Sequence, residues 1–505
     1  MKNFCLVSLF FTLLHASAQS PIGVFEDHLD VGKPTIAGSL VFDATTQTYL
    51  MKGSGYNIWF GRDEFQYAYK KLKGDFILTA NFAFTGDGGD PHRKIGWMLR
   101  NSLDADAAHC SAVLHGDGLT VLQWRLLKGA FMRDPEDEIF PSKKYYSVLQ
   151  LERNGRTVTF KAAHSGEPLQ LIGSTQMESL NDSLYAGLFI CSHDANKVEE
   201  AKIWNVRIDQ PVPQGYNPDR LGYIGCRLEI LDIASGVRKV IRESKGRFEA
   251  PNWMPDGKKL LFNEDGSLYT IPIEGGIPEK INTGAVNHLN NDHGISFDGK
   301  MLAISHHREG QEGGGSTIYV LPITGGQPRQ ITERTPSYWH GWSADGKEVA
   351  FVGMRDKKYY NIYTISAQGG AEKQLTENKG WHYDGPEYSR DGKYIYYNGS
   401  ESGTMQIWRM KTDGTSKEQL TFDEYNNWFP HLSPDGKWMV YISFPSDIDP
   451  KDHPSYKRVT LRLFSLTGGG SKVVAYLYGG QGTINVPSWS PDSKYISFVS
   501  NSQKY

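Results

Sequence analysis

The 505-residue sequence has only 4 cysteines, no surplus of either charge and no long apolar run after its first residues. Its 54 basic and 57 acidic side chains give a net charge of −3, so there is no excess of positive charge to hold a phosphate backbone. Nucleic acid is therefore not an expected partner. No stretch of the mature chain approaches the length that a transmembrane helix needs, so we do not expect the protein to span a membrane.

The first residues predict export. Lys2 precedes an apolar run from Phe4 to Leu14, and small residues follow up to Ala18. This order is typical of a secretory signal peptide that is cut after Ala18. We predict a signal peptide over residues 1–18 and a periplasmic or extracellular location for the mature protein.

Cysteine use leaves two interpretations open. Only Cys110, Cys191 and Cys226 follow the signal peptide, too few for a disulfide framework, and their spacing matches no zinc motif. Cys110 and Cys191 could pair in an oxidising compartment, or all three could be small apolar side chains buried on strands. In either case most of the stability must come from packing.

A repeat fills the second half of the chain. One phrase recurs six times. It consists of an aromatic or apolar residue, a short turn with Asp-Gly-Lys (Asp-Ser-Lys in the last copy) and a β-rich run. The turn aspartates stand at positions 256, 298, 345, 391, 435 and 492. Each copy predicts four short antiparallel strands, because Asp-Gly suits a tight turn and β-branched or aromatic runs flank it. Six copies predict a six-bladed β-propeller.

The ends of the repeat region predict how the ring closes. The last copy supplies strands around 485–490 and 494–500, whereas the matching outer strands appear upstream at 227–232 and 238–242. We expect these segments to form one blade together, which removes exposed sheet edges.

The first half has a different pattern. Alternating strands without a repeat occur at 75–84, 95–100, 119–125, 148–153, 157–162, 185–191 and 201–208. They favour a two-sheet antiparallel sandwich. We therefore predict an all-β protein with a sandwich over 19–210, a proline-bearing linker over 211–224 and a propeller over 225–505.

Both regions resemble known families. The six Asp-Gly phrases look like the WD40-like (PD40) repeats of TolB-family propellers, and the Gly74-Asp-Phe and Gly96-Trp-Met-Leu-Arg segments are similar to concanavalin A-like sandwiches. The combination resembles exported TolB-like proteins of Bacteroidetes-type bacteria, for which envelope protein partners are an implied role. Prolyl oligopeptidase-type peptidases carry similar propellers but need a Gly-x-Ser-x-Gly elbow, which this sequence lacks, so that activity is not expected.

The segments that lead into the innermost strands should meet at one mouth of the channel. We therefore expect candidate metal-binding and catalytic residues in these segments. His293 and His340 stand at the same repeat position, with His431 one residue nearer its turn. Imidazoles and carboxylates from several blades suit a divalent cation such as Zn²⁺ or Mn²⁺. Oligogalacturonate lyases, which have a similar propeller, use a histidine-bound metal, and these three histidines resemble such ligands. They could instead only hydrogen-bond neighbouring blades.

Aromatic and polar residues of the same segments predict a glycan-sized mouth. Tryptophan faces stack on sugar rings, and amides and carboxylates bind hydroxyl groups. The candidate ligand-binding residues are Asn291, Trp339, Trp381, Asp384, Glu387, Asn427 and Trp428, although single tryptophans can equally pack between blades. Asp384 and Glu387 are also candidates for a general acid and base.

Three functions follow from these observations. The first is recognition of a glycan or cell-envelope ligand at the mouth, with the sandwich as an accessory carbohydrate-binding module. Its Trp97, Trp124, Arg100, Arg125 and His115 could line a concave sheet, or Trp97 and Trp124 could simply belong to the core. The second is a metal-dependent polysaccharide lyase or hydrolase at the same mouth. The third is a scaffold for envelope proteins.

Overall fold

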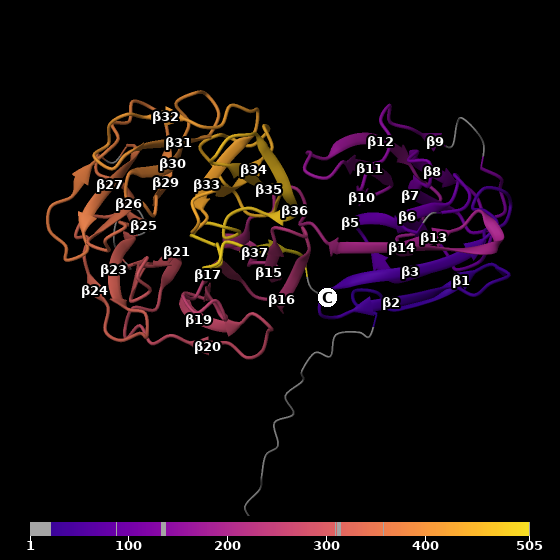
Figure 1. Ribbon diagram of the computed structural model, residues 1–505, viewed down its shortest axis with the longest axis horizontal. Coiled ribbons are helices and arrows are strands. Elements are labelled where there is room, and N and C mark those ends of the chain that lie inside the picture. Colours follow the sequence, from indigo (N-terminus) through magenta and orange to yellow (C-terminus); the bar gives the residue numbers. More distant parts are fainter. Residues whose placement is uncertain are drawn as a thin grey trace, which may run out of the picture.

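The computed structural model describes residues 22–86, 88–132, 138–308, 310, 315–356 and 358–503, and the predicted signal peptide lies outside them. The described chain is almost entirely β-structure, with a ring of small sheets beside a region of two larger sheets (Figure 1). None of its helices is long and apolar enough to cross a membrane.

Two seven-stranded antiparallel sheets form the first region. One sheet has the order β1 (Asp27–Val31), β4 (Phe65–Lys73), β13 (Ser183–Cys191), β6 (Lys94–Arg100), β7 (His109–His115), β8 (Thr120–Arg125) and β9 (Glu138–Ile139). The other has the order β12 (Gln170–Gln176), β11 (Thr157–Ala163), β10 (Val148–Asn154), β5 (Phe76–Thr85), β14 (Asp194–Asp209), β3 (Thr48–Gly55) and β2 (Ser39–Asp43).

One apolar core joins these two sheets. Leu78 and Phe82 of β5 pack in the same cluster as Ile95 and Trp97 of β6, because alternate residues of each strand point to the shared side. The predicted strands of this half are all present, and the Asn154-Gly155 turn joins β10 to β11 as expected. We call this part of the chain the sandwich region.

Five four-stranded sheets follow in chain order. Their strands are β17 (Phe248–Trp253), β18 (Lys259–Glu264), β19 (Ser267–Pro272) and β20 (Glu279–Lys280); β21 (Leu289–Ile295), β22 (Met301–His306), β23 (Thr317–Pro322) and β24 (Arg329–Gln330); β25 (Ser337–Trp342), β26 (Glu348–Met354), β27 (Tyr360–Ser366) and β28 (Lys373–Gln374); β29 (Tyr383–Tyr388), β30 (Tyr394–Gly399), β31 (Gln406–Lys411) and β32 (Glu418–Gln419); β33 (Asn426–Leu432), β34 (Trp438–Phe444), β35 (Lys457–Ser465) and β36 (Ser471–Gly479).

The sixth blade is built from both ends of the repeat region, as predicted. β37 (Tyr495–Asn501) pairs with β15 (Cys226–Asp232), which pairs with β16 (Arg238–Ser244). The predicted strand at 485–490 is not a regular strand: it makes one isolated bridge, between Trp489 and Ile496. Pro487 cannot donate a ladder hydrogen bond there. The all-β architecture with a six-bladed propeller is thus confirmed.

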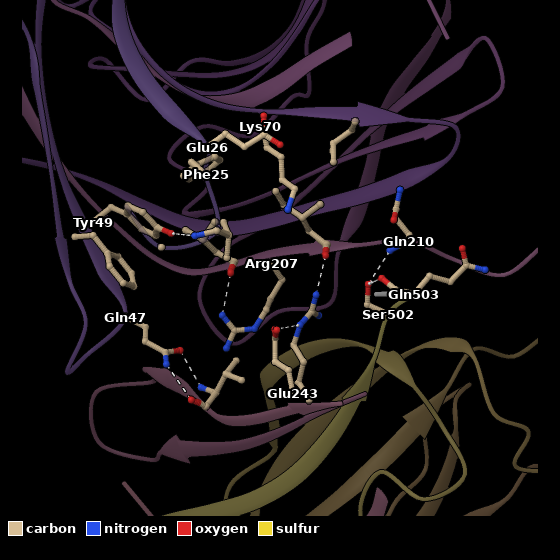
Figure 2. A pocket seen from close by; sticks show the side chains of 18 of the residues that line it. Phe25, Glu26, Gln47, Tyr49, Lys70, Arg207, Gln210, Glu243, Ser502 and Gln503 are labelled. Atoms are coloured by element: carbon tan, nitrogen blue, oxygen red, sulfur yellow. Dashed lines mark hydrogen bonds and ion pairs between the residues drawn. The ribbon is translucent and has the colours of Figure 1, made fainter. Parts of the chain in front are cut away.

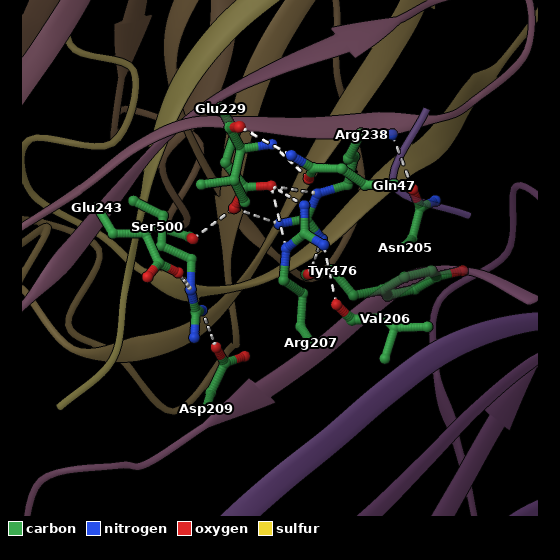
Figure 3. A network of polar contacts seen from close by, with 12 residues as sticks. Gln47, Asn205, Val206, Arg207, Asp209, Glu229, Arg238, Glu243, Tyr476 and Ser500 are labelled. Atoms are coloured by element: carbon green, nitrogen blue, oxygen red, sulfur yellow. Dashed lines mark hydrogen bonds and ion pairs between the residues drawn. The ribbon is translucent and has the colours of Figure 1, made fainter. Parts of the chain in front are cut away.

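A buried network joins the sandwich region to this closing blade (Figure 3). Arg207 of β14 and Arg238 of β16 bind the Glu229 carboxylate of β15, at 2.5 and 2.8 Å, and Ser500 donates a further hydrogen bond to it. Burial alone would raise the pKa of Glu229, but the two guanidinium groups hold it well below its usual value. The connecting segment 210–225 contains the short helix α1 (Pro218–Leu221).

Cys110, Cys191 and Cys226 are free and buried. Burial raises the pKa of the Cys191 thiol to about 11, so it stays protonated near neutral pH. The open choice between a Cys110–Cys191 bridge and buried thiols is therefore resolved, in this structure, in favour of buried thiols.

Candidate functional site

The propeller channel has two distinct ends. The innermost strands of the blades all run in the same direction along the channel axis. Their first residues therefore meet at one end of the channel and their last residues at the other. We call the end where β17, β21, β25, β29 and β33 begin the N-mouth, and the end where they finish the C-mouth.

A bulge interrupts each of these five strands and separates the two ends. The pairing register shifts between Glu249 and Asn252 in β17 and between Asp384 and Glu387 in β29, for example. Ala250, Gly385 and Phe429 adopt positive φ within these bulges. Such a bulge re-aims the side chains on either side of it. Residues only three apart in sequence therefore belong to different ends of the channel.

Three imidazoles surround one buried carboxylate at the N-mouth. Asp384 lies 3.0 Å from His340 Nε2, 3.6 Å from His382 Nε2 and 3.8 Å from His453 Nε2. Burial alone would raise the pKa of Asp384, but its interactions with His340 and His382 outweigh burial and hold the pKa below its usual value. Burial likewise opposes the charged form of His340, yet its hydrogen bond to Asp384 raises the pKa of that imidazole.

Two further carboxylates beside this group are less well matched. Burial raises the pKa of Asp292 to about 7, nearby Asp384 and Glu249 add to the rise, and His340 offsets only part of it. No lysine or arginine pairs with Asp292 among the described residues. Burial also raises the pKa of Glu249, although Arg247 binds it. The N-mouth thus holds more carboxylates than the nearby basic side chains can pair with.

His453 lies on an insertion in the fifth blade, outside the repeated phrase. It lies on the segment between β34 and β35, and its ring contacts Trp428 with centroids 4.4 Å apart. On the same segment, Lys451 Nζ donates to the Gly380 carbonyl at 2.8 Å. Sequence reasoning missed His382 and His453. The one signal for His453 was the longer interval between the turn aspartates at 435 and 492.

The C-mouth has a different lining. A cavity of about 330 Å³ there is lined by residues of all six blades, half of them aromatic residues or prolines. Six of its lining residues stand three positions before each turn aspartate: Trp253, Ile295, Trp342, Tyr388, Leu432 and Trp489. The repeat itself contained this signal, because its first member is aromatic or apolar in every copy.

Known proteins match the propeller part of the chain. The TolB β-propeller domain family, PD40, matches residues 338–504. An uncharacterized protein of Agrobacterium fabrum is 45% identical over 279 residues, which are 55% of this chain and 93% of that protein. A solved structure from Agrobacterium tumefaciens, described as a TolB, shares 45% identity with a TM-score of 0.52, over 55% of this chain and 99% of that one.

This chain belongs to the TolB-like PD40 propeller family. The Tol-Pal system protein TolB of Francisella tularensis is 24% identical over 259 residues, which are 50% of this chain and 56% of that protein. The chain therefore spans little more than half of that relative.

The three histidines predicted as metal ligands do not come together in this PD40 propeller. His293 is buried beside the backbone of Ala250 and Asn291, and burial lowers its pKa to about 3. Both ring nitrogens of His431 are engaged, by Glu387 Oε2 and the Ile484 carbonyl, each at 2.6 Å. Among the described residues, no three His, Cys, Asp or Glu side chains are arranged so that they could hold a metal ion. A metal held by these three would have to break the His431 contacts, so the predicted set does not fit one.

The predicted acid and base are also separated. Asp384 lies in the N-mouth cluster, whereas Glu387 binds His431 and the backbone N–H of Leu432 and lines the C-mouth cavity. Glu387 therefore holds two blades together. The prediction of a paired general acid and base is not supported by this geometry.

The predicted ligand-binding tryptophans divide into two kinds. Trp339 and Trp428 are buried in cores between blades, with 1% and 0% exposure, so neither offers a free face to a sugar. Trp381 is 36% exposed and directly precedes His382 at the N-mouth. Asn427 is buried, and its Nδ2 donates to Gln406 Oε1 and Asp423 Oδ1, whereas Asn291 Nδ2 lies 3.5 Å from Glu249 Oε1.

The candidate sugar-binding residues of the sandwich region are buried. Trp97 and Trp124 belong to its core. Arg100 and Arg125 are fully buried and both bind Asp63, at 2.8 and 2.6 Å. His115 is 7% exposed. The prediction that these side chains line an open concave surface is wrong, because they support the sheet from within.

Another cavity, of about 630 Å³, lies between the sandwich region and the closing blade (Figure 2). Arg207, Gln210 and Glu243 are among the residues that line it. Gln47 and Val240 also line it, and the Gln47 side chain exchanges two hydrogen bonds with the Val240 backbone, at 2.9 and 2.8 Å. The two regions are therefore held together by directional contacts around this space.

Proposed function

We propose that the protein is an exported recognition protein that binds a hydroxyl-rich cell-envelope ligand, a glycan, at the N-mouth. The observation that carries the proposal is the convergence of Asp292, His340 and Asp384 from three blades with His453 from the insertion. Carboxylates and imidazoles exchange hydrogen bonds with sugar hydroxyls, and ligand sites characteristically combine a few such groups with aromatic walls. Trp381, which directly precedes His382 in the sequence, is 36% exposed and supplies an aromatic face.

The N-mouth site does not include the sandwich residues Trp97, Trp124, Arg100, Arg125 and His115, because they are buried. It also does not include metal-dependent catalysis, because His431 is committed to Glu387 and Ile484. A second candidate, an envelope protein scaffold, has the likeness to a Tol-Pal system protein in its favour.

Binding of the exported protein to an array of bacterial envelope glycans tests the proposal, followed by calorimetry with a bound glycan. Asp384→Asn is expected to weaken binding by about tenfold or more, since it removes charged hydrogen bonds. Trp381→Ala is expected to weaken it by about fivefold through lost stacking.

Two variants serve as controls. Glu333→Gln removes an exposed carboxylate of the loop before β25, and Ile277→Ser removes an exposed apolar side chain between β19 and β20. Both should bind as the unmodified protein does. Glycan binding that survives both Asp384→Asn and Trp381→Ala would show that the N-mouth is not the site. Capture of envelope proteins without any glycan binding would favour the scaffold.

A further inference from the structure

A second cavity lies next to the C-mouth cavity, outside the ring. It has a volume of about 690 Å³ and lies between the closing blade, the first blade and the sandwich region. It shares Trp253, Pro255 and Pro491 with the C-mouth cavity. We call the two together the C-mouth groove. Its lining reaches from the innermost strands at the C-mouth to the β2–β3 turn.

Polar side chains of both regions line the outer part of this groove. Its lining includes Thr45, Thr46, Thr48 and Lys202 from the sandwich region, with Asp232 and Lys239 from the closing blade. Hydroxyl, carboxylate and ammonium groups together can satisfy both the donor and the acceptor of a hydroxyl group. Acids and bases are mixed here, so the groove does not select a strongly charged ligand.

One buried donor and one buried acceptor close to the shared residues lack hydrogen-bond partners within the described chain. Trp253 and Asn252 are buried, with 7% and 3% exposure, and Trp253 Nε1 and Asn252 Oδ1 have no hydrogen-bond partner in the described chain. Both residues line the C-mouth cavity. Buried polar atoms are normally paired, and a hydroxyl group is able to pair with both. Trp253 also stacks on Tyr495, with centroids 5.9 Å apart, so the groove has an aromatic wall.

The backbone of the surrounding turns is already satisfied internally. The Lys258 and Lys494 N–H groups donate to Asp256 and Asp492 of their own turns, and the Gly257 N–H donates to the Met254 carbonyl. An extended peptide is usually recognised through free strand edges or backbone groups. Recognition here must use side chains, which favours a carbohydrate over a peptide.

Gln47 fixes the sandwich side of the groove. It stands between Thr46 and Thr48 and is bound to the backbone of Val240, next to Lys239 (Figure 2). Its own side chain does not line the outer cavity. Gln47 is thus a positioning residue for the β2–β3 turn, and the Arg207–Glu229–Arg238 network fixes the same junction from inside.

We propose that the C-mouth groove is a second binding site, for a neutral oligosaccharide chain that runs from Trp253 at the axis to the Thr45–Thr48 turn. The proposal is independent of the function assigned to the N-mouth. The two regions would then share one site, which explains why directional contacts hold them in a fixed relation.

Titration calorimetry of the exported protein with cello-, malto- and manno-oligosaccharides of increasing length tests this proposal. At least one series should bind, with affinity rising as rings are added. Trp253→Phe keeps the aromatic wall but removes the N–H, and should weaken binding by about fivefold. Lys239→Met, a milder change on the outer lining, should weaken it by about threefold. Trp438→Phe changes an indole that lines neither cavity and should have no effect.

Gln47→Ala separates positioning from general destabilisation. It should abolish the gain in affinity with length while short oligomers bind as before, which a loss of overall stability would not produce. The proposal is overturned if no oligosaccharide binds or if peptides bind instead. It is also overturned if Trp253→Phe, Lys239→Met and Gln47→Ala all leave the affinity unchanged. Binding lost only in Asp384→Asn would place the sugar at the N-mouth, supporting the proposed function and rejecting this second site.

Discussion

The sandwich region and the propeller channel both bury carboxylates, but they differ in whether a basic side chain pairs with the buried carboxylate. In the sandwich region, Asp63 is fully buried and bound by Arg100 and Arg125, so its charge is matched within the fold. At the N-mouth, Asp292 is almost as buried and is paired with no lysine or arginine among the described residues. A buried charge that is fully paired is explained by structure, whereas an unmatched one is a candidate for function.

The buried carboxylate at the junction between the regions is also fully paired. Glu229 is bound by two arginines and a serine, one arginine coming from the sandwich region. The comparison therefore separates charges that hold the molecule together from charges that face the channel. The following predictions test that separation.

The largest effect is expected from deletion of residues 484–505. This removes β37, which pairs with β15, and opens the ring. Because closure alone removes the exposed sheet edges, the propeller should lose its cooperative thermal transition. Calorimetry and circular dichroism measure this. A truncated chain that keeps the full transition would show that the ring does not depend on closure.

Glu229→Gln should cost about 3–5 kcal/mol of the free energy of unfolding, because two buried guanidinium groups lose their counter-charge. Denaturant unfolding measures the change. Glu243→Gln is the matched control: Glu243 pairs with Arg227 but its side chain is 43% exposed, so the loss should stay below about 1 kcal/mol. Equal losses in the two variants would contradict the distinction between buried and exposed pairs.

Asp292→Asn should have the opposite sign. The folded-state pKa of about 7 lies above the ordinary value of 3.8, so the unfavourable contribution of ionised Asp292 grows as pH rises from the lower value to the higher. The variant should therefore be more stable than the unmodified protein above neutral pH, by on the order of 1–3 kcal/mol, with the gain vanishing in acid. Unfolding curves across this pH range measure it. A loss of stability above neutral pH would mean that the ionised carboxylate is matched after all.

The smallest effect is expected at His293. Its folded-state pKa of about 3 lies below the ordinary 6.5, so the unfolded chain binds the extra proton and stability falls as pH drops below the ordinary value. His293→Phe should remove this contribution and reduce the loss between neutral pH and about pH 5 by about 1–2 kcal/mol. The measurement is the pH dependence of the unfolding midpoint in guanidinium chloride. An unchanged dependence would show that His293 is protonated without cost.

Sequence alone predicted most of the fold, for a local reason. The Asp-Gly turns and the alternating runs specify their own hairpins, and the upstream strands at 227–232 and 238–242 supplied what the last copy lacked. Such signals depend on neighbouring residues and on strand periodicity, which a sequence displays directly.

The candidate site was predicted only in part. The sequence placed His340 and Asp384 at one mouth, and they are hydrogen-bonded there. It could not show that the bulge in β29 turns Glu387 away from Asp384, or that Trp339 and Trp428 lie inside blade cores. It also could not bring His453 from its insertion to the axis.

What the sequence determined by itself was therefore the number of blades, their strand order and the segment that closes the ring. The tertiary structure alone decided which polar side chains meet, which buried charges are matched, and that one groove is lined by both regions. The physical reason is that hairpins follow from local turn and strand preferences, whereas side-chain meetings depend on bulges, blade packing and the fixed junction between the regions.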